Sequence, residues 1–173
     1  MKYINLGDGE IKISALGLGC MGMTHAYGKP SDENEMIKLI HSAFDMGITF
    51  FDTVECYLGT TENGDIASNE ELVAKALKNY RDKVIIATKF GVKHNNTELI
   101  TDSRPETIIK SVDGSLKRLG TDYIDLYYLH RVDPNVPIED IAYLMKNFIK
   151  QGKIKHWGLS EAGIETKPMQ YVL

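Results

Sequence analysis

The sequence TFFDTVECY at residues 49–57 combines an apolar run with a carboxylate and a phenol. Its two phenylalanines indicate a short buried strand that begins near Thr49 and ends at Asp52. A carboxylate thus stands at the C-terminal end of the strand, and the phenol of Tyr57 follows in the next loop. Reactive side chains of parallel α/β folds commonly lie at these strand ends. The stretch therefore predicts one corner of an active site.

Two later strands end in the same way. The sequence VIIATKF at residues 84–90 brings Lys89 to a strand end, and YIDLYYLHR at residues 123–131 brings His130. Each of these residues alone has an ordinary structural explanation. A carboxylate can cap a turn, a tyrosine can pack against other side chains, and a histidine can be a core residue whose ring nitrogens are hydrogen-bonded. A lysine that ends an apolar strand is less usual, because burying an ammonium without a partner is costly. Together the four residue types form a proton-transfer set.

Strand and helix patterns alternate along the whole chain. Residues 1–13 predict a hairpin around Asp8-Gly9, residues 58–68 and 92–102 are polar loops, and Gly120 and Gly152 end helices. The alternation is typical of βα units and a parallel sheet. We therefore predict an α/β fold of about five βα units in a single domain, residues 1–173. The expected strands are 15–22, 49–52, 84–88, 124–129 and 154–159, and the expected helices are 33–45, 68–77, 103–119 and 137–151.

Two α/β architectures fit this alternation. The glycines Gly17, Gly19 and Gly22 match the G-x-G-x-x-G fingerprint of dinucleotide-binding doubly wound sheets, which requires that the glycines open a helix directly. Here a loop ending at Pro30 intervenes, and the helix is expected to start near Glu33. We therefore favour a barrel strand whose glycines allow close approach of a ligand or another backbone. A (β/α)₈ barrel also accounts for the polar residues at strand ends.

Composition narrows the class of function. The formal net charge is −4, so there is no basic surplus to neutralise phosphates, and neither a nucleic-acid nor a membrane partner is expected. No long apolar run and no signal-peptide pattern is present, which predicts a cytoplasmic protein. The two cysteines, Cys20 and Cys56, form neither a disulfide framework nor a zinc motif, and no metal site is expected.

The proton-transfer set suits carbonyl chemistry. A lysine beside a phenol favours the phenolate and so lowers the tyrosine pKa from its usual value of about 10. Asp52 can supply the carboxylate that such a lysine needs, and a histidine beside the phenol can hold a carbonyl oxygen or relay a proton. These groups would protonate a carbonyl oxygen while another group attacks its carbon.

Six motifs in this order resemble the aldo-keto reductases: GLGCMGM, GITFFDTVECY, NEELVAKAL, RDKVIIATKFG, SLKRLGTDYIDLYYLHR and GKIKHWGLSEA. The resemblance covers nearly the whole chain. It implies the (β/α)₈ TIM-barrel fold with an N-terminal hairpin that closes the bottom of the barrel, and hydride transfer between NADP(H) and a small-molecule carbonyl or alcohol. The branch it resembles has longer loops and also includes the potassium-channel β subunits.

The resemblance also implies roles for individual residues. The family tetrad maps onto Asp52, Tyr57, Lys89 and His130. Tyr57 would be the general acid, Lys89 would lower its pKa, Asp52 would pair with Lys89, and His130 would position the carbonyl. The residues implied on the cofactor side are Cys20, Met21, Asp52 and Ser160, with Glu161 following where many members have Asn.

The length of the chain departs from the family pattern. At 173 residues it lacks about three βα units of a complete barrel of about 250 residues. Five parallel strands cannot close such a barrel, so we expect a truncated barrel that is marginally stable or self-associates through its open edges. Three functions follow as alternatives: a carbonyl reductase, a non-catalytic cofactor-binding barrel like the channel β subunits, and an inactive remnant.

Overall fold

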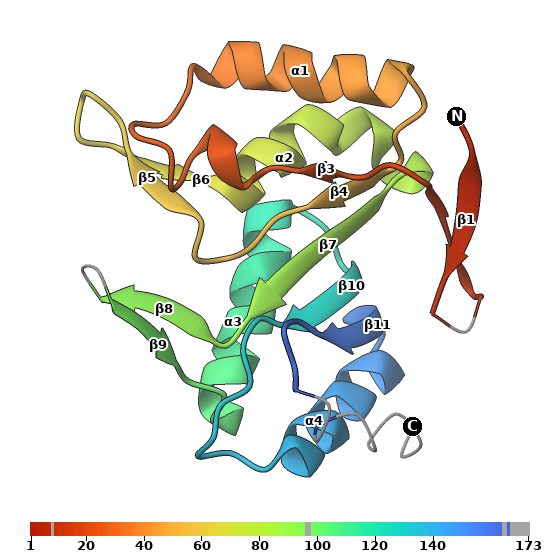
Figure 1. The fold of residues 1–173 in the computed structure, drawn as a ribbon, viewed down its shortest axis with the longest axis vertical. Helices are drawn as coiled ribbons and strands as arrows, with labels where there is room; N and C mark the ends of the chain where they lie inside the picture. Colours follow the sequence, from red (N-terminus) through yellow and green to blue (C-terminus); the bar gives the residue numbers. More distant parts are fainter. Residues whose placement is uncertain (8, 96–97, 164–165, 167–173) are drawn as a thin grey trace. The chain divides into compact units, whose positions relative to one another are not determined.

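Parallel strands follow one another in the sheet in the same order as in the sequence (Figure 1). In the computed structural model, which describes residues 1–7, 9–95, 98–163 and 166, the strands are β3 (Leu18–Gly19), β4 (Phe50–Asp52), β7 (Ile85–Phe90), β10 (Ile124–Leu129) and β11 (Ile154–Leu159). The β3–β4, β4–β7 and β10–β11 pairs are parallel. The α/β class with a parallel sheet is therefore confirmed.

The chain divides into two compact units. One consists of Met1–Ala87 with Arg118–Gly120, and the other of Thr88–Lys117 with Thr121–Leu173. Strand β7 and helix α3 (Pro105–Leu119) contribute residues to both.

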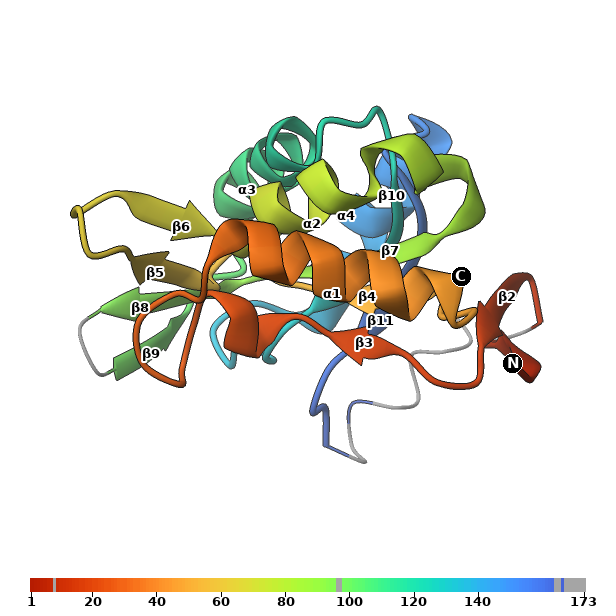
Figure 2. The same ribbon diagram turned by 90° about the horizontal axis from the view of Figure 1, so that it is seen from above.

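Two helices lie side by side in the first unit (Figures 1 and 2). Helix α1 (Glu33–Asp45) and helix α2 (Asn69–Leu77) are joined where His41 Nε2 lies 2.8 Å from the Ala76 carbonyl oxygen. Both helices start at a side-chain cap, because Asp32 accepts a hydrogen bond from the Glu35 N–H and Ser68 accepts one from the Glu71 N–H. The predicted hairpin is also present, as β1 (Tyr3–Leu6) and β2 (Ile11–Ser14); Asp8 of its turn lies outside the described residues.

The glycines Gly17, Gly19 and Gly22 belong to β3 and its flanking segments and do not form a dinucleotide-binding fingerprint. A Cβ on Gly17 would lie 2.8 Å from Cδ1 of Phe50, so this strand requires a glycine at that point for close packing. The segment after β3 is a single 3₁₀ turn, η1 (Met21–Met23), and α1 begins only at Glu33. The expected loop between the glycines and the first α-helix is confirmed.

The prediction that residues 58–68 and 92–102 form only polar loops was wrong. Each segment contains a short antiparallel hairpin, β5 (Leu58–Thr60) with β6 (Ile66–Ser68), and β8 (Val92–Asn95) with β9 (Glu98–Thr101). Gly64 has φ +87°, as the Asn63-Gly64 dipeptide allows in a hairpin turn. Polar composition concealed these strands, because they carry few apolar residues to mark a buried face.

The second unit places helices beside β10 and β11. Helix α4 (Ile138–Lys150) buries Ile141, Met145 and Phe148, and Ile138 is half-buried. The Lys153 ammonium, just after α4, donates to Asp113 of α3 at 2.6 Å. Gly120 and Gly152, with φ +60° and +74°, follow α3 and α4 in the left-handed conformation that favours glycine. The predicted bounds of β10 and β11 are confirmed.

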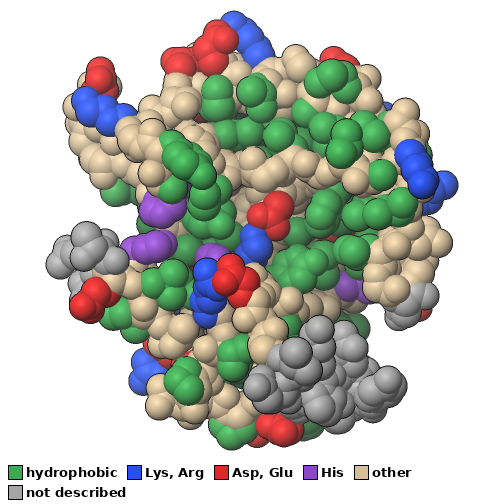
Figure 3. Space-filling model, viewed as in Figure 1, with side chains coloured by type: hydrophobic (Ala, Val, Ile, Leu, Met, Phe, Trp, Pro, Cys, Tyr) green, Lys and Arg blue, Asp and Glu red, His purple; other side chains and the backbone are tan. Residues whose placement is uncertain are grey.

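Large apolar side chains fill the interior of each unit. The fully buried side chains of the first unit include Ile40, Phe51, Leu77 and Ile86. In the second unit the rings of Phe90 and Tyr127, both fully buried, have centroids 4.6 Å apart. On the face drawn in Figure 3, charged side chains of both signs are scattered over the surface. Within the described residues, no helix has the length and apolar character needed to cross a membrane.

Candidate active site

Asp52 and Cys20 are neighbours at the C-terminal ends of β4 and β3. Asp52 is the last residue of β4 and is half-buried, whereas Phe51 before it is fully buried. The Cys20 N–H donates to the Asp52 carbonyl oxygen at 2.9 Å. Cys20 is itself fully buried, and Met21 after it is half-buried in η1. The strand end predicted from the sequence is therefore confirmed for Asp52.

Tyr57 lies in the loop between β4 and β5 and is half-buried. Its ring stacks on the imidazole of His25, with ring centroids 5.6 Å apart and planes inclined by 14°. His25 Nδ1 lies 2.9 Å from the Leu58 carbonyl oxygen, and this contact fixes the imidazole beside the loop. The phenol thus has a defined neighbour in the first unit that sequence reasoning did not anticipate.

Lys89 and His130 come together in the second unit. Lys89 is the next-to-last residue of β7 and only 9% exposed, and the His130 N–H donates to the carbonyl oxygen of the adjacent Phe90 at 2.9 Å. Burial lowers the pKa of His130 to about 4, and the positive charge of Lys89 acts in the same direction, followed by Arg131 and His94. At neutral pH the imidazole is therefore uncharged, and its ring can hydrogen-bond a carbonyl oxygen.

The lowered pKa of His130 predicts acid-sensitive stability. The folded-state pKa lies below the unfolded value of 6.5, so protonation favours the unfolded chain. This contribution is complete above pH 6.5 and is lost as the pH falls toward about 4. Lowering the pH from 7 to 4.5 should reduce the free energy of unfolding of both proteins. We expect this reduction to be about 1–2 kcal/mol smaller in His130→Gln than in the unsubstituted chain, after allowance for solvent screening.

Urea denaturation of both proteins at the two pH values measures this difference. An NMR titration of the His130 ring provides the control, because it reports the pKa directly. A ring that titrates above about pH 6 would contradict the prediction.

Ser160 lies at the tip of β11, next to His130 in space. Its N–H donates to the carbonyl oxygen of Leu129, the residue before His130, at 2.9 Å. The side chain is half-buried, and its hydroxyl has no hydrogen-bond partner among the described residues. The next residue, Glu161, has φ +52° and forms an ion pair with Arg131. Within the described part of the chain, this hydroxyl leaves a donor and an acceptor available to a ligand.

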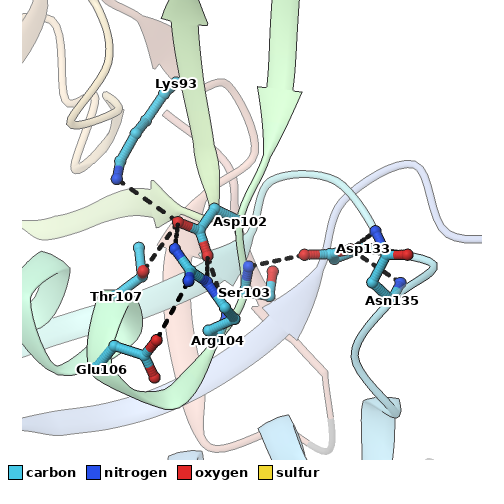
Figure 4. A network of polar contacts seen from close by, with 8 residues as sticks. All are labelled: Lys93, Asp102, Ser103, Arg104, Glu106, Thr107, Asp133 and Asn135. Atoms are coloured by element: carbon cyan, nitrogen blue, oxygen red, sulfur yellow. Dashed lines mark hydrogen bonds and ion pairs between the residues drawn. The ribbon is translucent and has the colours of Figure 1, made fainter.

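A polar network holds the loop that follows His130 (Figure 4). The buried carboxylate of Asp133 accepts hydrogen bonds from the Ser103 N–H and the Asn135 N–H, both at 2.9 Å. Beside Ser103, two hydrogen bonds from the Arg104 guanidinium, both at 2.9 Å, hold the pKa of the Asp102 carboxyl well below its usual range. The network therefore ties the loop after His130 to the start of α3.

The structure thus assembles the predicted residues within two units. Asp52, Tyr57, Cys20 and Met21 belong to the first unit, and Lys89, His130 and Ser160 belong to the second. Sequence reasoning missed the contacts of Tyr57 with His25, Thr24 and Asn69. No group of three or more His, Cys, Asp or Glu side chains in the described part of the chain is arranged to hold a metal ion.

Comparison with known proteins decides the family. The sequence model of the Aldo/keto reductase family matches residues 15–170. The chain belongs to this family. It is 44% identical over 168 residues to a curated relative, "Probable aldo-keto reductase 1" of Glycine max, in a match that covers 96% of this chain and 46% of the relative.

Solved aldo-keto reductase structures share the fold. The holo form of aldo-keto reductase AKR11C1 from Bacillus halodurans has a TM-score of 0.81 and 31% identity, covering 98% of this chain and 53% of that one. The glycerol dehydrogenase AKR11B4 from Gluconobacter oxydans also has a TM-score of 0.81, with 30% identity, covering 96% of this chain and 50% of that one. The chain therefore spans about half the length of these relatives, and its fold is a portion of the family's barrel.

Proposed function

We propose that this chain carries the proton-transfer residues of an NADP(H)-dependent reductase that converts aldehydes or ketones to alcohols. The observation that carries the proposal is the position of the family's tetrad. Asp52 is the last residue of β4, and Tyr57 follows it in the next loop. Lys89 is the next-to-last residue of β7, and His130 immediately follows β10. Each of these is the strand end at which barrel enzymes carry their chemistry.

The four side chains have complementary roles in this proposal. Tyr57 gives its phenolic proton to the carbonyl oxygen, and the positive charge of Lys89 makes that proton easier to release. By the family resemblance, Asp52 would balance the charge of Lys89. His130, neutral at pH 7, orients the carbonyl oxygen through its ring N–H, without a second positive charge beside the lysine.

In this proposal, residues from each unit bind the nicotinamide end of the cofactor. The hydroxyl of Ser160, for which the described residues provide no partner, can hydrogen-bond a carboxamide, and the half-buried Met21 offers an apolar contact beside the Asp52 strand end. Cys20, being fully buried, would act through its backbone. When bound, the cofactor would supply the hydride that adds to the carbonyl carbon as Tyr57 protonates the oxygen.

NADPH consumption tests the proposal. The purified chain is mixed with NADPH and an aromatic aldehyde such as 4-nitrobenzaldehyde, and the absorbance of NADPH is followed with and without the aldehyde. We expect aldehyde-dependent consumption with formation of the benzylic alcohol. A chain that binds NADPH but does not oxidise it would favour the non-catalytic barrel. A chain that neither binds nor oxidises NADPH would favour the inactive remnant.

We also propose that the chain self-associates. Within the described residues, β11 pairs with β10 and is the last strand in the order of its sheet, so its other edge can pair with a strand of a second copy. We expect the sedimentation coefficient to rise with protein concentration. His156→Pro should weaken this pairing, because the Ile124 N–H bonds to the Lys153 carbonyl and residues two apart share a side, so the His156 N–H points away from β10; His156→Val keeps the strand propensity and serves as the control. A concentration-independent monomer would contradict this proposal.

A further inference from the structure

The peptide carbonyl of Tyr57 accepts two hydrogen bonds from buried groups. The hydroxyl of Thr24 donates to it at 3.0 Å, and the backbone N–H of Asn69 donates at 3.1 Å. Thr24 is 4% exposed and Asn69 is fully buried. A carbonyl oxygen has two lone pairs, so these two donors satisfy it completely. The backbone of Tyr57 is therefore held from two separate segments of the first unit.

The side chain of Asn69 joins those segments to each other. Its amide nitrogen donates to the Cys20 carbonyl oxygen and to the Thr24 hydroxyl oxygen, both at 2.8 Å. Its amide oxygen accepts a hydrogen bond from the Thr53 hydroxyl at 2.6 Å. Both N–H groups of the amide are thus used, in a site without solvent exposure. Such a buried network is rigid when all of its members are satisfied.

The first residue of helix α2 belongs to this hydrogen-bond network. Asn69 is the first residue of α2, where the backbone N–H has no partner within the helix. Here that N–H is donated to Tyr57, in a loop without a strand or helix of its own. The helix start therefore holds the Tyr57 backbone, while His25, the residue after Thr24, stacks on the Tyr57 ring.

We propose that Thr24 and Asn69 are positioning residues for Tyr57, which fix its backbone so that the phenol stays aligned with the substrate carbonyl. This inference rests on the proposed function of Tyr57 and deepens it. A misplacement of about 1 Å can cost about 10²-fold in rate. The two residues act through Tyr57 and do not themselves touch the substrate.

A comparison of Thr24→Val with Thr24→Ser tests the proposal. Valine removes the hydroxyl at nearly equal volume, and serine retains it. We expect Thr24→Val to lower kcat by about 10- to 100-fold with KM changed by less than about threefold, and Thr24→Ser to stay within about threefold of the unsubstituted chain. Thr107→Val is the matched control, because it removes another buried hydroxyl that donates to Asp102, in the second unit.

Amide hydrogen exchange provides a readout that does not depend on turnover. We expect the Tyr57 and Leu58 amides to exchange at least about tenfold faster in Thr24→Val than in Thr24→Ser. The Ile85 amide, bonded to the Thr49 carbonyl in the same unit, should exchange at the same rate in both. Faster exchange at all three amides would mean general destabilisation and would overturn the proposal.

The two readouts separate this proposal from the proposed function. If the unsubstituted chain does not turn over, the reductase proposal fails for this chain, and the exchange data alone decide whether Thr24 and Asn69 fix the loop. Unchanged exchange at Tyr57 and Leu58 overturns the positioning role in either case. Equal losses of kcat in Thr24→Val and Thr107→Val overturn it as well.

Discussion

Replacing Tyr57 with Phe is expected to lower the rate of aldehyde reduction by about 10³-fold or more. The substitution removes only the phenolic oxygen. The aromatic ring remains and can still stack on His25, and the backbone carbonyl keeps its bonds from Thr24 and Asn69. Without the phenol, the proposed mechanism has no group at this position to protonate the substrate oxygen. The neutral state of His130 makes it a weak substitute.

The measurement compares NADPH consumption by the unsubstituted chain, Tyr57→Phe and Tyr143→Phe under the same conditions. Tyr143 lies on α4 and is 71% exposed, so the same chemical change there should leave the rate unchanged. NADPH affinity, measured by fluorescence, should change little in either variant. If Tyr57→Phe retained more than about a tenth of the activity, the proton would have to come from another group.

The sequence predicted the elements whose patterns are local. The strands that carry Asp52, Lys89, His130 and Ser160 are short apolar runs, and each predicted strand end lies within a residue or two of the observed one. Helix starts were also predictable, because a cap and its partner lie three residues apart, as in Asp32 with Glu35. These signals need no knowledge of tertiary contacts.

The support of Tyr57 could not be predicted in this way. Asn69 reads in the sequence as part of a capping pattern, and that local explanation hides its bonds to Thr24 and Cys20, which lie 45 and 49 residues away. The hairpin at residues 58–68 was missed for a different reason. Its Asn63-Gly64 turn signal was present, but strands of three residues on either side were too short to show alternation.

Arg118 in helix α3 forms an ion-pair cluster beneath the Tyr57 loop. Its Nε donates to Glu70 Oε2 at 2.5 Å, and a terminal nitrogen lies 3.7 Å from Glu55 Oε2. The side chain of Glu70 is fully buried, and those of Glu55 and Arg118 are 15% and 27% exposed. Glu55 lies two residues before Tyr57, and Glu70 follows Asn69. The cation therefore neutralises a carboxylate that water cannot reach.

Replacing Arg118 with Met should lower the free energy of unfolding by about 3–5 kcal/mol, because it keeps the packing volume but removes the Arg118 cation from the buried Glu70 carboxylate. Urea denaturation measures this loss. The double variant Arg118→Met with Glu70→Leu removes both charges, so it should recover most of the lost stability, since apolar replacements of a buried pair are often nearly neutral. A single-variant loss below about 1 kcal/mol, or a double variant no more stable than the single one, would mean that Glu70 is stabilised by other contacts. Because Glu55 and Asn69 adjoin the same cluster, the single variant should also raise the exchange rates of the Tyr57 and Leu58 amides, which joins the stability of this ion pair to the placement of the phenol.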